Sequence, residues 1–480
     1  MSYIPSSNDL YAILPMIILS LGAITLLGIQ FWLPDDQEHT PLLVVTFLVF
    51  LGALFSIYVG ATSTPGYGKY FKGQFTISLL TSWLNAIYVM SGLCTLLIAP
   101  KALEQTQTLF AEFYPLLLFA VTGMTFLTSG NDFIVIFVGL EILSLSLYIL
   151  IGMARNSIFS LESAMKYFLL GAFSSGFMLM GIAFLFGGSG STNMELALHG
   201  LNNSGYLSNY SKIGFGFFLI GVFFKIALVP FHAWTPDVYE GAQTPITGFM
   251  ASAGKASAMG LLIVLFSKIA PGNTSEPWAY LVGVLSLVSM TWGNLAALRQ
   301  TNLKRMLAYS SIAHAGYICA GISVGAGLEA LYYLIIYVFM NLSVFGIVSY
   351  LEEGKRKVDI ASISNLSASH PYLAIALSIL FLSFAGLPPL GGFWAKLFLL
   401  QRLAESSNPF SIILLFGAVA NSAIAFAYYM RIPVMAYMRT EVGSFASWDS
   451  KVEWGLALVV VGTLLLLSLG WLVFQPGALL

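Results

Sequence analysis

The chain has 480 residues, of which 58% are hydrophobic and only 9% are charged, and its formal net charge is −1. A soluble domain carries about 25% charged residues, so this composition excludes a soluble globular protein and offers no basic surface for nucleic acid. The only cysteines, Cys94 and Cys319, are too few to hold an iron-sulfur cluster or a structural zinc ion. Any redox chemistry associated with this protein must therefore occur on another chain.

Apolar runs of about 20 residues recur along the whole chain without strand-like alternation, which predicts membrane-spanning helices rather than barrel strands. The first run lacks a preceding basic region and a cleavage site, so it is interpreted as a span and not as a signal peptide. The predicted fold is an all-α polytopic membrane protein. It has about fourteen spans, near residues 10–31, 42–62, 75–98, 111–129, 131–152, 163–187, 211–231, 245–268, 276–297, 302–323, 327–351, 371–403, 410–437 and 455–474.

The connections between these spans differ in Lys and Arg content. If the N-terminus is outside, eleven of these cations fall on the cytoplasmic side and five on the other, which favours both termini on the outer side. The Gly-, Ser- and Asn-rich residues 188–210 are expected to be a flexible external loop. The charged run Glu352–Lys357 in the connection 352–370 is interpreted as a solvated cytoplasmic segment, with a partner-docking site as the alternative.

A lysine and a predicted helix break occur together in the seventh span. Lys225 lies deep in an apolar helix, and Pro230, His232 and Pro236 follow where that helix should continue. Unpaired backbone groups cost several kcal/mol in hydrocarbon, so such a break must be packed in protein or line a wet cavity. A buried lysine beside it predicts an ion path.

The twelfth span is interrupted in the same way, at Gly386–Gly392, and is followed by Lys396. Paired interruptions at corresponding places indicate an inverted-repeat transporter fold. We therefore predict two inverted five-helix repeats, spans 4–8 and 9–13, with broken helices 7 and 12. The predicted segments are an N-terminal three-helix segment (1–100), a first repeat (111–268), a second repeat (276–437) and a C-terminal helix (455–474).

Glu141 lies about 15 Å into its span, near the membrane midplane. An acid at that depth is costly unless it is paired or protonated, and Lys225 is its natural partner. A glutamate kept only for packing is the alternative. The position of Lys225 before its break, at the negative end of a half-helix, favours the charged ammonium, whereas Lys396 follows its break near a positive end, which favours the neutral amine.

Three further buried groups are candidates for a proton relay. Lys255 is surrounded by small residues that allow close helix contact, although it could instead cap a carbonyl. His314 is flanked by hydroxyl side chains and could pass a proton, or could be a hydrogen-bonded packing histidine. His232 could take part or could only satisfy carbonyls freed by the break. Lys166, one turn into its span, is expected to reach the membrane interface.

These residues resemble the antiporter-like membrane subunits of complex I, the bacterial NADH-quinone oxidoreductase, and among them the subunit N group. The resemblance covers roughly residues 110–435, and Asp237–Gly241 and Lys396 favour subunit N over its sister subunits. Gln243 stands where the family pattern has proline. The segments that carry the resemblance are Gly139–Tyr148, Ala164–Ala172, Pro230–Gly241 and Leu307–His314.

The resemblance implies a proton-translocating subunit that couples quinone reduction elsewhere in the complex to proton transfer. It implies a coupling ion pair (Glu141 and Lys225), a central hydrophilic axis (Lys255 and His314) and a gate towards the outside (Lys396). It also implies a place in the cell inner membrane beside other antiporter-like and small membrane subunits. No cofactor or metal is expected on this chain, because NADH, FMN, iron-sulfur clusters and quinone belong to other subunits.

Three rival functions remain open at this point. A subunit of a multisubunit sodium/proton antiporter would share the broken helices and the Glu and Lys pattern, although Asp237–Gly241 argues against it. A secondary transporter for a small solute would need a pocket of specific polar side chains. A passive scaffold would only space the pumping subunits.

Overall fold

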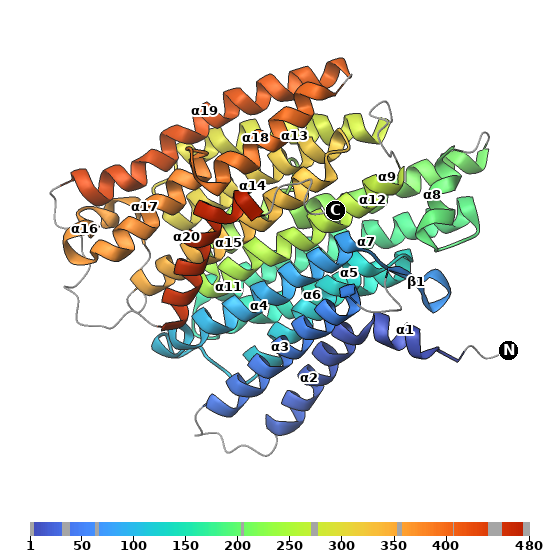
Figure 1. Cartoon of the computed structure of the whole chain (residues 1–480), viewed down its shortest axis with the longest axis horizontal. Helices are drawn as coiled ribbons and strands as arrows, with labels where there is room; N and C mark the ends of the chain where they lie inside the picture. Colours follow the sequence, from blue (N-terminus) through green and yellow to red (C-terminus); the bar gives the residue numbers. More distant parts are fainter. Residues whose placement is uncertain are drawn as a thin grey trace. The chain divides into compact units, whose positions relative to one another are not determined.

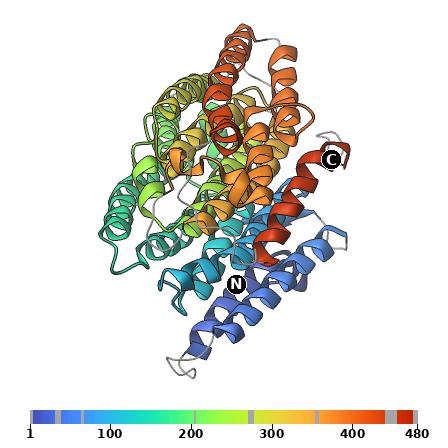
Figure 2. The same ribbon diagram turned by 90° about the vertical axis from the view of Figure 1, so that its left-hand side faces the viewer.

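The computed structural model describes residues 4–30, 39–62, 67–202, 206–269, 277–352, 358–406, 408–439 and 454–473. The chain divides into two compact units, one made of Met1–Leu96, Thr108–Lys225 and Ala253–Leu261, and the other of Leu97–Gln107, Ile226–Ser252 and Leu262–Leu480. Each unit consists almost entirely of helices (Figures 1 and 2).

The elements up to the first break are helical except for one hairpin. They are α1 (Ser7–Ala12), α2 (Leu14–Gln30), α3 (Thr40–Thr62), β1 (Gly68–Tyr70), a 3₁₀ turn (Phe71–Gly73), β2 (Phe75–Ile77), α4 (Leu79–Gln105), α5 (Phe113–Ser129), α6 (Phe133–Gly152), α7 (Ile158–Ser189), α8 (Met194–Asn202) and α9 (Tyr206–Ile226). In this unit α2 and α3 run side by side (Figure 1), and α5 packs against α2 and α6.

The remaining elements begin with two short helices. They are α10 (Trp234–Gly241), α11 (Thr244–Phe249), a π-helical turn (Met250–Gly254), α12 (Lys255–Ile269), α13 (Pro277–Leu298), α14 (Leu303–Ser323), α15 (Gly327–Leu351), a 3₁₀ turn (Ile360–Ile363), α16 (Leu366–Ser369), α17 (Pro371–Ala385), α18 (Gly391–Glu405), α19 (Pro409–Met438) and α20 (Trp454–Val473). Almost all side chains of α14 and α15 are buried, so these two helices form the centre of the second unit.

Several helix starts follow from capping residues. Asp132 accepts a hydrogen bond from the backbone N–H of Ile134 at the start of α6, and Asn302 accepts one from Arg305 at the start of α14. Pro371 and Pro409 stand in the first turns of α17 and α19, where proline costs no intrahelical hydrogen bond. These local signals explain why the predicted spans begin near the right residues.

The prediction of an all-helical polytopic membrane protein is confirmed at the level of its long helices. Within the described ranges, eight helices are long and apolar enough to cross a membrane: α3, α4, α6, α7, Thr244–Ile269, α13, α15 and α19. Shorter apolar helices include α2, α5, α17 and residues 454–470. The exception is the hairpin, because Phe75–Ile77, predicted as the start of the third span, pairs with Gly68–Tyr70. Its aromatic and β-branched residues favour a strand.

Two expectations about the connections are corrected at the residues that the structure describes. Residues 188–210 contain the helix α8, because Met194, Ala197, Leu198 and Leu201 recur at helical spacing and are all buried. Glu352 is not part of a purely solvated run, because its carboxylate forms an ion pair with the buried Lys304. Residues 353–357, the rest of that charged run, lie outside the described residues.

Candidate functional site

The first break lies between α9 and α10, at residues 227–233. The sequence predicted a break after Lys225, with the span running to residue 231, whereas helix α9 already ends at Ile226, directly after Lys225. The backbone N–H of Val229 donates to the Ser289 hydroxyl on α13 (2.9 Å), so a group released by the break is satisfied inside the protein. His232 is half-buried, with its ring edge-on to Trp292 and the ring centroids 6.1 Å apart.

Lys225 is buried and is held by two hydroxyl groups. Its ammonium donates to Ser144 on α6 (3.0 Å) and to Tyr167 on α7 (2.8 Å). Glu141 lies one turn before Ser144 on the same helix, and its carboxylate acts electrostatically on Lys225. Among the described residues the two charges form no direct ion pair, and one oxygen of Glu141 has no hydrogen-bond partner. The hydroxyl groups of Ser144 and Tyr167, and not the carboxylate of Glu141, therefore hold the ammonium directly.

Lys255 is the first residue of α12 and is only 1% exposed. It follows the π-helical turn Met250–Gly254, a type of irregularity that occurs frequently at functional sites. Around it the packing is tight: the Tyr88 hydroxyl donates to the carbonyl of Ala256 (3.4 Å), and a methyl group added at Gly260 would meet that same hydroxyl. Lys255 therefore lies in a closely packed interior at a change of helix geometry.

The second break separates α17 from α18. Gly386 has a φ of +85°, a conformation that glycine adopts without strain, and it ends α17. The N–H of Gly392 donates to the Ser383 hydroxyl (3.1 Å). The ammonium of Lys396 reaches back across the break and donates to the carbonyls of Phe384 (3.0 Å) and Ala385 (3.1 Å).

This geometry corrects the expectation that Lys396 meets only the positive end of α18. The residue belongs to α18, but its Nζ lies at the carbonyl end of α17, where the helix dipole is negative. Lys225, in the last turn of α9, also lies near a negative helix end. The two lysines are therefore alike in this respect, because a four-carbon side chain can reach over the break.

His314 lies in the middle of α14 and bonds through both ring nitrogens. Nδ1 is 2.8 Å from the Tyr333 hydroxyl on α15, and Nε2 is 2.8 Å from the Tyr429 hydroxyl on α19. The Tyr429 hydroxyl also bonds to that of Ser310. The histidine is thus one member of a buried chain of proton-exchanging groups.

Tyr317 lies between His314 and Lys396. The Lys396 ammonium is 5.3 Å from the Tyr317 ring centroid, and the rings of Tyr317 and His314 are 6.1 Å apart. Tyr317, Tyr333 and Tyr429 were not among the predicted site residues. Tyr317 could have been found from its position one turn after His314, whereas the other two lie on separate helices and carry no such signal.

The structure groups the candidate residues in two sets. Glu141 and Lys225 come together in the first unit, and His314 and Lys396 come together in the second. In the part of the chain that the structure describes, no three His, Cys, Asp or Glu side chains are arranged to hold a metal ion.

The sequence matches a family of known membrane subunits. Residues 130–422 match the model described as "NADH:quinone oxidoreductase/Mrp antiporter, TM". NADH-quinone oxidoreductase subunit N of Leptospira biflexa is 61% identical over 100% of both chains. Subunit N of Leptospira interrogans is 51% identical over 100% of this chain and 94% of that protein. These full-length matches decide against the rival prediction of a sodium/proton antiporter subunit.

Solved structures show the same fold. A chain of respiratory complex I from Thermus thermophilus, determined with bound aureothin, has a TM-score of 0.80 and 31% identity over 95% of this chain and 97% of that one. A chain of the Mrp complex from Dietzia has a TM-score of 0.84 over 99% of this chain and 97% of that one, but at 18% identity this likeness concerns the fold alone. The chain belongs to the NADH:quinone oxidoreductase/Mrp antiporter family and, within it, to subunit N of NADH-quinone oxidoreductase.

Proposed function

We propose that five groups carry the protons through this proton-translocating subunit of respiratory complex I: the half-buried Glu141 and the buried Lys225, Lys255, His314 and Lys396. The observation that carries the proposal is the coincidence of buried lysines with irregular helix. Lys225 precedes the first break, Lys255 follows the π-helical turn, and Lys396 spans the second break. Ionisable groups inside a membrane protein are costly, and irregular backbone there lines functional paths.

Lys225 is the proposed input of the path. Its ammonium is held by Ser144 and Tyr167 rather than by Glu141 itself. A change of charge arriving from a neighbouring subunit can therefore draw Glu141 towards Lys225 or away from it without breaking an existing ion pair. Moving one proton against 100 mV costs about 2.3 kcal/mol, which is comparable with the interaction of partly buried charges a few ångströms apart.

Lys396 is the proposed output towards the outside. The carbonyls of Phe384 and Ala385 stabilise its ammonium form, so it can hold a proton that arrives through the groups around His314. The ring of Tyr317 lies beside both Lys396 and His314, so the two groups share a neighbour. In this scheme Lys255 is an intermediate proton-carrying group, and His232 is a further candidate for that role.

The proposed architecture has fourteen spans, with two inverted five-helix repeats at 111–268 and 276–437 between an N-terminal segment (1–100) and a C-terminal helix (455–474). Both breaks release a backbone N–H that a serine hydroxyl accepts, which supports treating them as equivalent positions. We place the subunit in the cell inner membrane with both termini outside, beside other antiporter-like and small membrane subunits. NADH, FMN, iron-sulfur clusters and quinone are assigned to other subunits.

The input assignment is tested with Glu141→Gln and Lys225→Met in the assembled complex. NADH-driven proton uptake into reconstituted vesicles and the rate of NADH oxidation are measured together. The matched control is Lys166→Met, because Lys166 is another helical lysine but is 43% exposed and pairs with Glu162 on its own helix (2.7 Å). We expect fewer protons per NADH in both test variants and an unchanged ratio in the control. Unchanged ratios in all three variants would favour a passive scaffold.

A further inference from the structure

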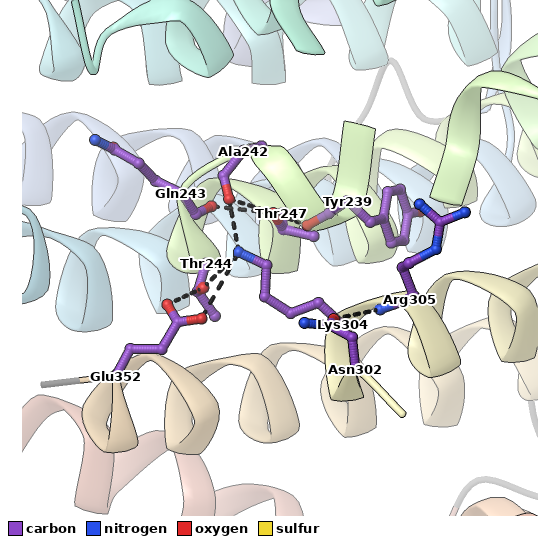
Figure 3. A network of polar contacts seen from close by, with 9 residues as sticks. All are labelled: Tyr239, Ala242, Gln243, Thr244, Thr247, Asn302, Lys304, Arg305 and Glu352. Atoms are coloured by element: carbon purple, nitrogen blue, oxygen red, sulfur yellow. Dashed lines mark hydrogen bonds and ion pairs between the residues drawn. The ribbon is translucent and has the colours of Figure 1, made fainter. Parts of the chain in front are cut away.

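Two consecutive cations, Lys304 and Arg305, stand in the first turn of α14 (Figure 3). The N-terminus of a helix is the positive end of its dipole, so cations are locally unfavourable there. The first turn of α14 also contains no acidic residue to offset them. Their position must therefore be stabilised by partners outside α14, and the structure shows those partners.

Arg305 binds the acidic side of α10. Its Nη1 donates to Asp237 (2.8 Å) and to Glu240 (3.0 Å). These two acids are three residues apart and so lie on one face of their helix. All three side chains are partly shielded from solvent, with exposed fractions between 24% and 40%. This contact gives a structural role to the acidic motif at Asp237–Gly241.

Lys304 binds the connection between α10 and α11. Its side chain is only 8% exposed, and its Nζ donates to the carbonyl of Ala242 (2.7 Å) and to the Thr244 hydroxyl (3.0 Å). The Thr244 hydroxyl donates in turn to Glu352 at the end of α15, and one Glu352 oxygen lies 3.7 Å from Lys304 (Figure 3). The buried ammonium is therefore both hydrogen-bonded and neutralised.

We propose that these residues form a clamp, consisting of Lys304, Arg305, Asp237, Glu240, Thr244 and Glu352, which fixes the broken segment α10–α11 for proton transfer. The proposal rests on the proton relay described above. Helices α10 and α11 have eight and six residues, too short to be stable by themselves. Tertiary contacts must therefore set the position of these two helices. The clamp supplies such contacts to both, through the charged side chains of Arg305, which binds α10, and Lys304, which binds α11.

The location of the clamp makes it a positioning device rather than only a stabilising one. Along the chain, α11 leads through the π-helical turn directly to Lys255. The other side of the clamp is α14, which carries His314. Loss of the clamp is therefore expected to shift the broken segment and slow proton transfer, while quinone reduction on other subunits continues. The clamp residues themselves carry no proton in this scheme.

The test uses Arg305→Gln and Lys304→Met in the whole complex reconstituted into vesicles. The amount of assembled complex, the rate of NADH oxidation by quinone and the protons taken up per NADH are measured. We expect assembly and NADH oxidation to persist and the protons per NADH to fall. The exchange Arg305→Glu with Glu240→Arg keeps one ion pair of the clamp and is expected to recover part of the ratio.

A second arginine provides the matched control. Arg402 on α18 also lies between two carboxylates, Glu329 (3.1 Å) and Glu405 (3.2 Å), but it is half-exposed and neither contact involves α10 or α11. Arg402→Gln is expected to leave the protons per NADH unchanged. An equal fall in this control would show that the ratio responds to any lost ion pair and would overturn the positioning role.

Two further outcomes would overturn the clamp. One is an unchanged ratio in assembled Arg305→Gln and Lys304→Met complexes. The other applies if Arg305→Gln and Lys304→Met prevent assembly: it is a normal ratio in assembled Asp237→Asn complexes, in which only one of the two Arg305 contacts is altered. Lys225→Met, measured in parallel, distinguishes the proton-relay proposal from the clamp proposal. If Lys225→Met lowers the protons per NADH and the clamp variants do not, the relay proposal is supported and the clamp proposal is wrong.

Discussion

At the scale of single residues, His314 is defined by its two tyrosine partners. A neutral imidazole has one N–H donor and one acceptor nitrogen, so one of Tyr333 and Tyr429 donates to the ring and the other accepts from it. A proton can then enter at one nitrogen and leave from the other. The Ser310 hydroxyl, bonded to Tyr429, extends this chain on one side.

Tyr429→Phe tests this chain. It removes the partner of the Nε2 atom of His314, and a buried polar group left unpaired costs about 1–3 kcal/mol. We predict a lower thermal stability of the subunit and fewer protons per NADH, measured on the same preparation.

The neighbouring Tyr428 supplies the control for that variant. It is equally buried, but its hydroxyl donates to Asn294 (3.0 Å) instead of to the histidine. Tyr428→Phe should lower the stability by a similar amount and leave the protons per NADH unchanged. If both variants lowered the ratio alike, the effect would not be specific to the bond between Tyr429 and His314, which would contradict this prediction.

At the scale of elements, the presence of the two helix breaks was predictable from the sequence. The side chains that accept hydrogen bonds from the backbone at those breaks were not. Proline and glycine next to lysine mark both interruptions in the sequence, because these residues end helices locally. The serines that close them, Ser289 and Ser383, look like any other serine in an apolar helix. Only the packing of α13 against residues 227–233, and of α17 against α18, gives them that role.

Ser289 and Ser286 on α13 provide a matched pair for the first break. Both are fully buried and both donate to a carbonyl of their own helix, but only Ser289 also accepts from the N–H of Val229. Ser289→Ala is predicted to destabilise the subunit by about 1–3 kcal/mol more than Ser286→Ala, because it leaves that N–H unpaired. Thermal unfolding of the purified complex measures the difference. Equal effects would mean that the break does not depend on this bond.

The second break requires glycine at residue 392. A methyl group there would lie 1.9 Å from the carbonyl oxygen of Ser383, so α17 and α18 would have to separate. Gly392→Ala is predicted to cost about 1–3 kcal/mol, as overpacked cores do, and to lower the protons per NADH because Lys396 spans the same contact.

Gly462→Ala in α20 is the control, since nothing lies within 4 Å of the added group. It should be neutral or slightly stabilising, because alanine favours a helix more than glycine does. A Gly392→Ala complex as stable as this control would contradict the close helix contact at the break.

At the scale of the whole molecule, composition and periodicity were enough to predict the fold class. Each predicted span overlaps one or more described helices, because apolar runs of membrane length leave the backbone few alternatives. The failures are the hairpin at 68–77, which includes the predicted start of the third span, and the helix α8, which lies in a polar connection where that constraint is absent. The clamp was missed because its members are distant in the sequence.

The orientation in the membrane is a prediction that the Lys and Arg distribution makes by itself. A single cysteine placed near either end, in a chain with Cys94 and Cys319 replaced by serine, should react with a membrane-impermeant thiol reagent added to the outer face of intact cells. Labelling only after the inner face is opened would reverse the predicted orientation of the chain. Lys396 would then be the output towards the inner side and not towards the outside.

The central claim is that protons pass through this subunit by way of its buried lysines. The most direct measurement is the number of protons taken up per NADH oxidised by reconstituted complexes that carry Lys396→Met, compared with the unaltered complex and with Lys166→Met. The account predicts a reduced ratio for Lys396→Met alone, with assembly and NADH oxidation retained. An unchanged ratio in a fully assembled Lys396→Met complex would contradict it.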